Sequence, residues 1–229
     1  MNQIETVEVA APEDYTMQYL CRLMLNNNRD KITTKKSYLA VRKLELIVSA
    51  ALTLSNKRGF SAMSLRELAQ ESNVSMGGMY SYFNSKTDLL EMILGEVERA
   101  ASTILATPPE VLKDDPEGQL VWHIETHVSL SEVMLPWFYF SYMEAKNFPY
   151  EQRRRAKETE EITEGFLLKI LRAGAAEGAF SCVDPELTGA LIKPLLQEWY
   201  VKRSKYRKRS VSQATYVAEV TRIVLSSLK

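Results

Sequence analysis

The chain has 229 residues, 45% of them hydrophobic and 25% charged, with 29 Lys and Arg against 29 Asp and Glu. This composition is ordinary for a folded soluble protein and excludes a disordered, collagen-like or low-complexity chain. Two cysteines, Cys21 and Cys182, are too few for a disulfide scaffold and indicate a reducing compartment. Residues 1–12 lack the basic start of a signal peptide, and no apolar stretch reaches the roughly 20 residues that span a bilayer. We therefore expect a cytoplasmic protein that does not enter the membrane.

The balanced net charge conceals an uneven distribution along the chain. Residues 29–99 hold eleven Lys and Arg against eight Asp and Glu, whereas residues 110–201 hold nine against sixteen. Residues 202–209 add six basic side chains and no acidic one. A basic front joined to an acidic rear favours a polyanionic partner for the front alone, although a basic stretch is more often a solvated face.

Apolar residues recur at helical spacing in almost every segment, and no segment has the alternation of a strand, so the sequence predicts an all-α protein. In the front half, we expect helices at 17–25, at 44–58 before the cap Gly59, at 65–72 after the cap Ser64, at 75–82, and at 86–106. Pro108 and Pro109 end the last of these. In the rear half, we expect five helices, at 116–130, 132–147, 150–177, 185–206 and 212–228, with a kink at Pro194.

The most informative stretch is residues 63–90. A helix with Leu65, Leu68 and Ala69 on one side turns sharply at Asn73, and a second, short helix begins after its cap Ser75. This is the layout of a helix-turn-helix, in which the second helix enters the DNA major groove and the first braces it.

Residues 42–106 resemble the TetR family of bacterial transcriptional repressors. The matching residues are Lys57, Arg58, Gly59 and Phe60, then residues 64–69, and then Val74, Ser75, Gly77, Met79, Tyr80, Tyr82, Phe83, Ser85, Lys86, Leu89 and Leu90. The resemblance implies an N-terminal three-helix DNA-binding domain followed by a helical domain for ligand binding and dimerisation. It divides the chain into an extension at 1–40, a helix-turn-helix domain at 41–85 and a ligand-binding and dimerisation domain at 86–229, with 86–106 as the connecting helix.

The same resemblance implies which residues contact DNA. Ser64 and Arg66 correspond to a phosphate contact and a base contact. The other positions are Met76, Gly77, Tyr80, Ser81 and Tyr82 on the DNA-facing side, and Lys86 as a phosphate clamp at a helix N-terminus. The family usually has a long polar residue near position 76 and a β-branched or small residue at 78. Met76, Gly77 and Gly78 depart from this pattern, which predicts a soft recognition helix that reads thymine methyls and groove shape.

Two basic segments have two interpretations each. Arg29, Lys31, Lys35, Lys36, Arg42 and Lys43 precede the motif, and they fit either an arm that follows DNA or a solvated linker. The run 202–209 fits either a second nucleic-acid patch or, as we favour, a solvated loop.

The rear domain is rich in aromatic residues, most of which are expected in its core. The family resemblance implies that some of them line a cavity for a small effector. The candidates are Trp122, Thr126, Trp137, Tyr142, Met143 and Phe166. Such a cavity suits an apolar or aromatic compound, and an acyl thioester would also need basic residues at its mouth, for which Arg153, Arg154 and Arg155 are the obvious supply.

Catalysis and metal binding are not expected. His123 and His127 are one helical turn apart, but no third ligand lies near them in the sequence, so we interpret them as a packed pair. No catalytic triad, phosphate-binding glycine loop or pair of carboxylates is recognisable. We therefore expect no enzymatic activity, no metal and no cofactor.

The sequence thus predicts a homodimeric repressor that binds a pseudo-palindromic operator and is released by a small molecule, with helix 86–106 as the lever. Dimerisation is expected through the last two helices, whose apolar faces hold Leu187, Leu191 and Leu195, and Tyr216, Val220, Ile223 and Val224. Two alternatives stay open. The protein would be an activator in the first, and in the second a ligand carrier or protein-interaction module of the same fold.

Overall fold

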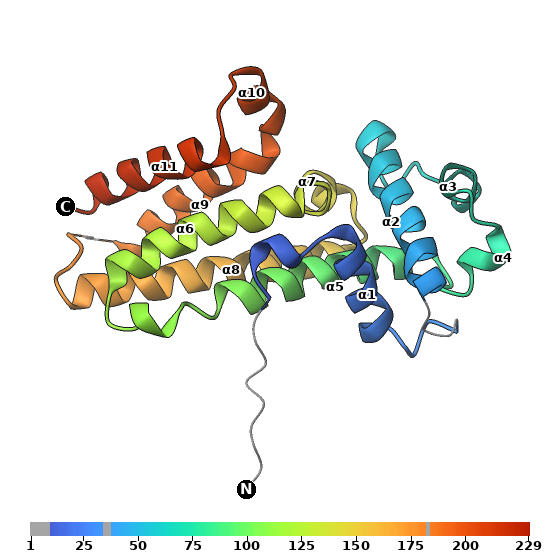
Figure 1. Cartoon of the computed structure of the whole chain (residues 1–229), viewed down its shortest axis with the longest axis horizontal. Helices are drawn as coiled ribbons and strands as arrows, with labels where there is room; N and C mark the ends of the chain where they lie inside the picture. The colour runs from blue at the N-terminus through green and yellow to red at the C-terminus, as the bar shows by residue number, and fades with distance from the viewer. Residues whose placement is uncertain (1–9, 34–37, 182–183) are drawn as a thin grey trace, which may run out of the picture.

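The computed structural model describes residues 10–33, 38–181 and 184–229. Within these ranges it has eleven α-helices, three short 3-10 helices and no strand, which confirms the predicted all-α class. The molecule is elongated, with α2, α3 and α4 at one end and the C-terminus at the other (Figure 1). None of the helices in the described residues is both long and apolar enough to cross a bilayer.

The front of the chain is built from five helices. They are α1 (Met17–Asn27), α2 (Tyr38–Arg58), α3 (Leu65–Ser72), α4 (Met76–Met79) and α5 (Lys86–Leu105), preceded by the 3-10 helix η1 (Pro12–Asp14). Gly59 follows α2 with a φ of +88°, a left-handed conformation that glycine adopts without strain. Ser85 caps α5 by accepting a hydrogen bond from the Asp88 amide at 3.0 Å.

The rear of the chain holds six helices, one more than predicted. They are α6 (Pro116–Val133), α7 (Leu135–Glu144), α8 (Tyr150–Ala176), α9 (Pro185–Val201), α10 (Arg203–Lys208) and α11 (Gln213–Ser227), with the 3-10 helices η2 (Glu110–Leu112) and η3 (Ala145–Asn147) between them. The single helix expected at 185–206 is wrong, because Lys202 leaves the helical conformation with φ −112° and ψ 27°. The Lys205 ammonium and the Tyr206 hydroxyl then both donate hydrogen bonds to the Glu198 carboxylate, which fixes the break between α9 and α10.

The buried apolar residues form two clusters. The first cluster contains residues of the five helices from α1 through α5 and of α7. The second contains residues of α6, α8, α9 and α11. Leu20, Cys21 and Met24 on α1 are at most 1% exposed, so this N-terminal helix is part of the first cluster. The buried face of α5 shares that cluster with α2 and α3, so this helix packs on the helices that precede it. Cys182 lies outside the described residues.

Candidate functional site

The turn between α3 and α4 is fixed by local caps. At the start of α3, the Glu67 amide donates to Ser64 Oγ at 3.2 Å and the Ser64 amide donates to Glu67 Oε2 at 2.9 Å. Asn73 ends α3 with a φ of +53°, and Ser75 caps α4 by accepting from the Gly78 amide at 3.1 Å. These short-range bonds give the chain the sharp turn of a helix-turn-helix.

The outer surface of α3 and α4 carries most of the residues predicted to contact DNA. Ser64, Arg66, Gly77 and Tyr80 are exposed, and Met76 and Ser81 are half-buried. The Ser64 hydroxyl donates to Glu67 Oε2 at 2.9 Å and the Ser81 hydroxyl donates to the Gly78 carbonyl at 2.6 Å, so both already serve the turn. Arg66 forms no ion pair with any residue that the structure describes, which leaves its guanidinium for an external acceptor.

The two adjacent glycines of α4 have different surroundings. A Cβ added at Gly77 would meet no atom within 4 Å, because this position faces outward. A Cβ at Gly78 would lie 3.1 Å from both Ser75 Oγ and Val74 Cγ1. Gly78 therefore allows α4 to close on the turn, while Gly77 presents bare backbone on the surface.

The structure corrects the role predicted for Tyr82. Its side chain is 1% exposed, and its hydroxyl donates to the Ala40 carbonyl on α2 at 3.1 Å. The ring and hydroxyl therefore point into the core, and burial raises the pKa of Tyr82. A side chain held in this way does not offer its hydroxyl to a phosphate, whereas Tyr80 is 47% exposed and can do so.

We expect Tyr82→Phe to lower the free energy of unfolding by about 1 kcal/mol, because it removes one buried hydrogen bond and keeps the ring. DNA affinity should not change. Urea unfolding and a gel shift measure the two quantities, and Tyr80→Phe is the matched control that should leave stability unchanged. A loss of DNA affinity in Tyr82→Phe without a loss of stability would restore the phosphate contact.

The structure also corrects the role predicted for Lys86. Its ammonium donates to the carbonyl oxygens of Ser61 at 2.8 Å, Met63 at 3.0 Å and Phe60 at 3.3 Å, and lies 5.4 Å from the centre of the Phe60 ring. An ammonium has three donors, and here backbone carbonyls accept from all of them. Lys86 thus closes the loop between α2 and α3 and is not arranged as a phosphate clamp.

The N-terminal extension is tied to the DNA-binding domain and to α5. The Thr33 amide donates to the Ser81 carbonyl at 3.0 Å, directly after α4. Asn27 Nδ2 donates to Glu96 Oε1 at 3.3 Å, and burial raises the pKa of this 1% exposed carboxyl group. The extension therefore connects the end of the helix-turn-helix, formed by the reading helices α3 and α4, to α5.

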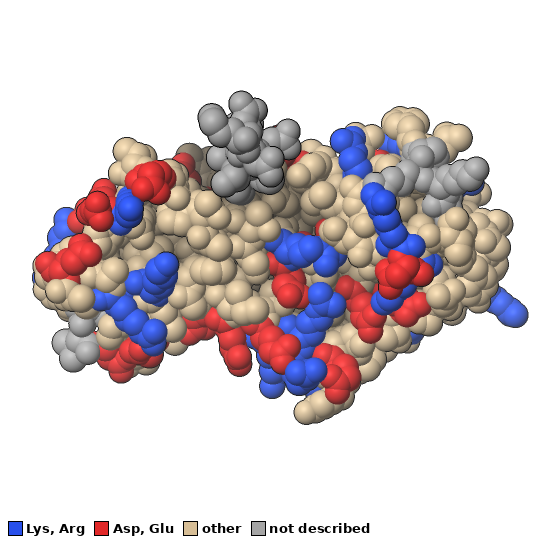
Figure 2. Space-filling model, turned by 90° about the horizontal axis from the view of Figure 1, so that it is seen from below, with Lys and Arg blue, Asp and Glu red and all other residues tan. Residues whose placement is uncertain are grey.

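Two of the basic residues that precede the helix-turn-helix motif are paired with carboxylates. Lys31 pairs with Glu91 at 2.8 Å and Arg42 pairs with Glu45 at 2.9 Å. Lys35 and Lys36 lie outside the described residues, while Arg29 and Lys43 are exposed. Figure 2 shows basic and acidic side chains interspersed over one long face of the molecule, without a single basic patch.

The basic run 202–209 is partly neutralised by acidic neighbours. Arg203 pairs with Glu132 at 2.8 Å and stacks over the Trp199 ring at 4.4 Å from its centre. Lys205 pairs with Glu198. These contacts attach α10 to α6 and α9, and they favour a structural role for this run.

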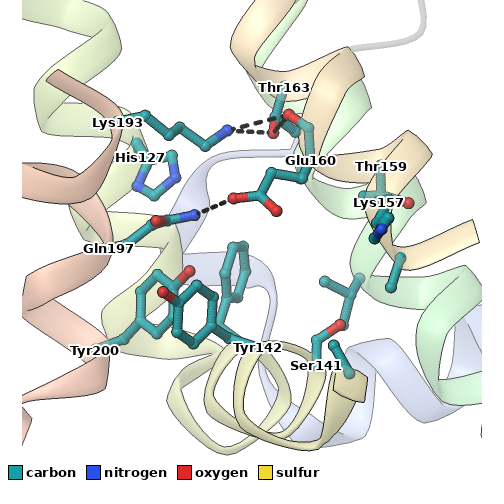
Figure 3. A pocket seen from close by; sticks show the side chains of 15 residues that line it. His127, Ser141, Tyr142, Lys157, Thr159, Glu160, Thr163, Lys193, Gln197 and Tyr200 are labelled. Atoms are coloured by element: carbon teal, nitrogen blue, oxygen red, sulfur yellow. Dashed lines mark hydrogen bonds between the residues drawn. The ribbon is translucent and has the colours of Figure 1, made fainter. Parts of the chain in front are cut away.

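A cavity of about 160 Å³ lies in the rear domain between α5, α6, α7, α8 and α9 (Figure 3). Val97 and Ala101 from α5 and Phe138 from α7 form apolar parts of its wall. Its polar wall is formed by His127 from α6, Glu160 and Thr163 from α8, and Lys193 and Gln197 from α9.

The polar wall is built around a buried lysine. Lys193 is 5% exposed, and its ammonium donates to Thr163 Oγ1 and, at 3.4 Å, to the Glu160 carbonyl. Burial lowers its pKa to about 8, against the opposing effect of the Glu160 and Glu164 carboxylates. Gln197 Nε2 donates to Glu160 Oε1 at 2.8 Å. Sequence analysis missed all of these residues.

Of the six residues predicted to line an effector cavity, Tyr142 alone lines this one. Trp137 is 1% exposed and packs in the first apolar cluster, Thr126 is buried, and Met143 is 40% exposed. Trp122 and Phe166 are half-buried and also lie outside the lining. The five other candidates lie on helices that border the cavity, but on faces that do not line it.

The arginines predicted at the cavity mouth are also engaged elsewhere. Arg154 pairs with Glu151 and Glu158, Arg155 pairs with Glu98, and the Arg153 guanidinium lies 5.9 Å from the centre of the Tyr150 ring. The exposed cation that does line the cavity is Lys157.

His123 and His127 are both buried, with ring centres 6.5 Å apart. Burial lowers the pKa of His123 to about 3 and that of His127 well below its ordinary value, so both rings are neutral at physiological pH. In the part of the chain that the structure describes, no group of three His, Cys, Asp or Glu residues could hold a metal ion.

Comparison with known proteins agrees with the geometry of the reading helices. Residues 47–93 match the family described as bacterial regulatory proteins, tetR family. The HTH-type transcriptional regulator HbdR of Aromatoleum sp. (strain CIB) is 26% identical over 173 residues, which cover 76% of this chain and 75% of the relative. The HTH-type transcriptional repressor KstR of Mycolicibacterium smegmatis is 41% identical over 54 residues, 23% of this chain and 26% of the relative.

Among solved structures, a regulatory protein of the tetR family from Rhodococcus RHA1 has the same fold. The TM-score is 0.71 at 19% sequence identity, covering 84% of this chain and 98% of the other. The family match spans α3 and α4, whose caps and exposed surface form the helix-turn-helix described above. This chain therefore belongs to the TetR family of bacterial regulatory proteins and is a DNA-binding transcriptional regulator.

Proposed function

We propose that this regulator is a repressor that binds a pseudo-palindromic operator as a homodimer and leaves it when a small molecule occupies the cavity of the rear domain. The observation that carries the proposal is the course of α5. This helix begins beside the reading helices, and its residues Val97 and Ala101 line the cavity. A ligand that moves α5 would change the spacing of the two helix-turn-helix units in the dimer. It can shift the equilibrium between the DNA-binding and the released conformation only by the difference in its affinity for the two.

The proposed DNA contacts are on the exposed surface of α3 and α4. Arg66 reaches a base edge, and Tyr80 offers its hydroxyl to a phosphate. Ser64 and Ser81 border this surface, and Met76 with the bare backbone of Gly77 allows close approach to thymine methyls. Residues 41–85 are the proposed helix-turn-helix domain, and residues 86–229 are the proposed ligand-binding and dimerisation domain.

Arg66→Ala should weaken binding to the operator by about 5- to 150-fold, which corresponds to about 1–3 kcal/mol for one arginine contact. Because the side chain is exposed and has no ion-pair partner among the described residues, thermal stability should not change. A gel shift against the DNA upstream of the chain's own gene measures the affinity.

Arg207→Ala is the matched control for this measurement. It removes the same charge from an exposed position on α10, in the basic run 202–209, and should leave operator affinity unchanged. Unchanged affinity in Arg66→Ala would contradict the proposed DNA surface. A loss confined to Arg207→Ala would assign DNA binding to the run 202–209 instead.

The homodimer is proposed to form through α9 and α11. Leu187 and Leu191 on α9 are 57% and 65% exposed, and Ile223 on α11 is 43% exposed. The other residues expected on the α11 face are buried in the second apolar cluster of the monomer and are not available to a partner: Tyr216, Val220 and Val224. Two such helices from each copy can form a four-helix bundle that covers the exposed Leu187, Leu191 and Ile223. Two helix-turn-helix units would then contact half-sites about 34–36 Å apart, which a single unit cannot do. The KstR relative, named a repressor, supports repression over activation.

A ligand carrier of the same fold is the second candidate. It would bind DNA only weakly and without sequence preference at physiological salt. The exposed Arg66 and the capped turn between α3 and α4 favour the regulator.

A further inference from the structure

We propose that the effector is a small carboxylate with an apolar body about the size of one aromatic ring, and that its anionic group pairs with Lys193 inside the cavity. This inference rests on the proposed function and names the ligand class of the same cavity. It replaces the acyl thioester that the sequence left open.

The first support is a buried cation whose charge is not balanced by a direct partner. Lys193 donates to a hydroxyl, Thr163 Oγ1, and to a carbonyl, that of Glu160, which are both uncharged. Among the described residues, no carboxylate oxygen lies within the 4.0 Å of an ion pair with its ammonium. An ammonium has three donors, so one remains for the cavity. Since a buried charge is costly unless it is paired, an anion is the ligand group that this site stabilises best.

The second support is a buried histidine beside the lysine. His127 is 4% exposed, and its Nδ1 has no hydrogen-bond partner in the described part of the chain. Figure 3 shows His127 next to Lys193 and Gln197, across the cavity from Lys157 and Ser141. In the tautomer that carries the proton on Nδ1, the neutral ring is a second donor for the same carboxylate. A buried polar atom without a partner commonly indicates a missing ligand or water.

The one carboxylate in the lining is already engaged. Glu160 receives the Gln197 amide at 2.8 Å, and Figure 3 shows it between Lys193 and Lys157. A ligand carboxylate would avoid it by binding on the His127 side of Lys193. This arrangement also discriminates against cationic ligands, which Lys193 would repel.

The cavity volume sets the size of the ligand. A cavity of about 150 Å³ in another protein binds benzene, and the cavity here measures about 160 Å³. Val97, Ala101 and Phe138 supply apolar surface for one ring, with Tyr142 at the side. A chain of many methylene groups would exceed this volume.

The test uses benzoate as the minimal probe and benzamide as its neutral counterpart of nearly the same shape, with calorimetry on the full chain. Benzoate should bind about tenfold tighter or more, the size expected for one charged hydrogen bond. Lys193→Met should remove this difference and keep the affinity for benzamide, which also reports that the variant is folded. Lys157→Met removes the exposed cation of the lining instead and should preserve most of the difference.

The pH dependence of the unmodified protein is an independent readout. Benzoate affinity should fall by up to tenfold per pH unit above about 8, because the Lys193 ammonium then loses its proton. Glu160 and Glu164 face this ammonium from α8, and the neutral rings of His123 and His127 face it from α6. Burial raises the pKa of Tyr200 on α9, the helix that holds Lys193, so the Tyr200 hydroxyl stays neutral in this range. Benzamide affinity should stay constant.

The outcomes separate this inference from the proposed function. Absence of benzoate binding at millimolar concentration, equal binding of benzoate and benzamide, or full benzoate binding by Lys193→Met would overturn the ligand class while operator binding stands. Benzoate binding through Lys193 that leaves operator affinity unchanged would support the ligand site and contradict the proposed release from DNA.

Discussion

Leu191→Glu is expected to convert the proposed homodimer into a monomer. It should then weaken operator binding by about 100-fold or more, since linking two DNA-binding units commonly raises affinity by about 10²–10⁴. Leu191 on α9 is 65% exposed, and Leu187, one helical turn before it, is 57% exposed. In a four-helix bundle, these side chains would lie at the centre of the interface. A carboxylate buried there without a partner opposes association far more strongly than the loss of a methyl group.

The control for Leu191→Glu is Val111→Glu, which places the same charge at an apolar side chain that is 87% exposed on η2, outside the proposed interface. It should leave both dimerisation and operator affinity unchanged. Light scattering at micromolar concentration gives the mass, and a gel shift gives the affinity. A dimer with unchanged affinity in Leu191→Glu, or an unmodified protein that is monomeric, would contradict an interface on α9 and α11.

The helix starts that depend on residues close in sequence could be predicted from the sequence. The capping residues Ser64, Ser75 and Ser85 each bond to an amide three residues further along, so their pattern is visible in the sequence itself. The start of α2 was placed too late, because Tyr38 and Leu39 are 68% and 69% exposed and add nothing to the buried face from which the helix was recognised.

The errors at the candidate DNA surface have a different physical origin. Tyr82 and Lys86 match the family pattern, but a contact distant in sequence decides which way each side chain points. Tyr82 bonds to Ala40, and Lys86 bonds to the carbonyls of the loop after α2. Local spacing carries no information about such contacts, so a matching residue can serve the core instead of the DNA.

The cavity shows how aromatic content can mislead. The rings of α6 and α7 were prominent in the sequence, but Trp137 and Phe140 pack in the first apolar cluster and do not line the cavity. The signal that could have found the polar wall was Lys193, a single charged residue between Ile192 and Pro194 in an otherwise apolar stretch of α9. A charge on the apolar face of a helix is rarely buried without a specific role.

Lys86→Met should lower the free energy of unfolding by about 2–4 kcal/mol, because each lost hydrogen bond from a charged donor contributes about 1.5–3 kcal/mol and water replaces part of that. The three carbonyls that Lys86 holds lie on the loop that leads into the capping box of α3. The methionine chain preserves the packing against Phe60 without the charge. Lys57→Met, at an exposed position near the end of α2, is the control and should leave stability unchanged.

The salt dependence of DNA binding distinguishes the loop contact from a phosphate clamp. A lysine that neutralises a phosphate releases counterions, so its removal reduces the slope of log affinity against log salt by about one. Because the Lys86 ammonium is already bonded to three carbonyls, Lys86→Met should leave this slope unchanged at temperatures where the variant is folded. Unchanged stability together with a reduced slope would show that the ammonium leaves the loop and binds a phosphate when the operator is present. The expected result, lower stability with an unchanged slope, would instead show that Lys86 acts on DNA only by holding α3 in place.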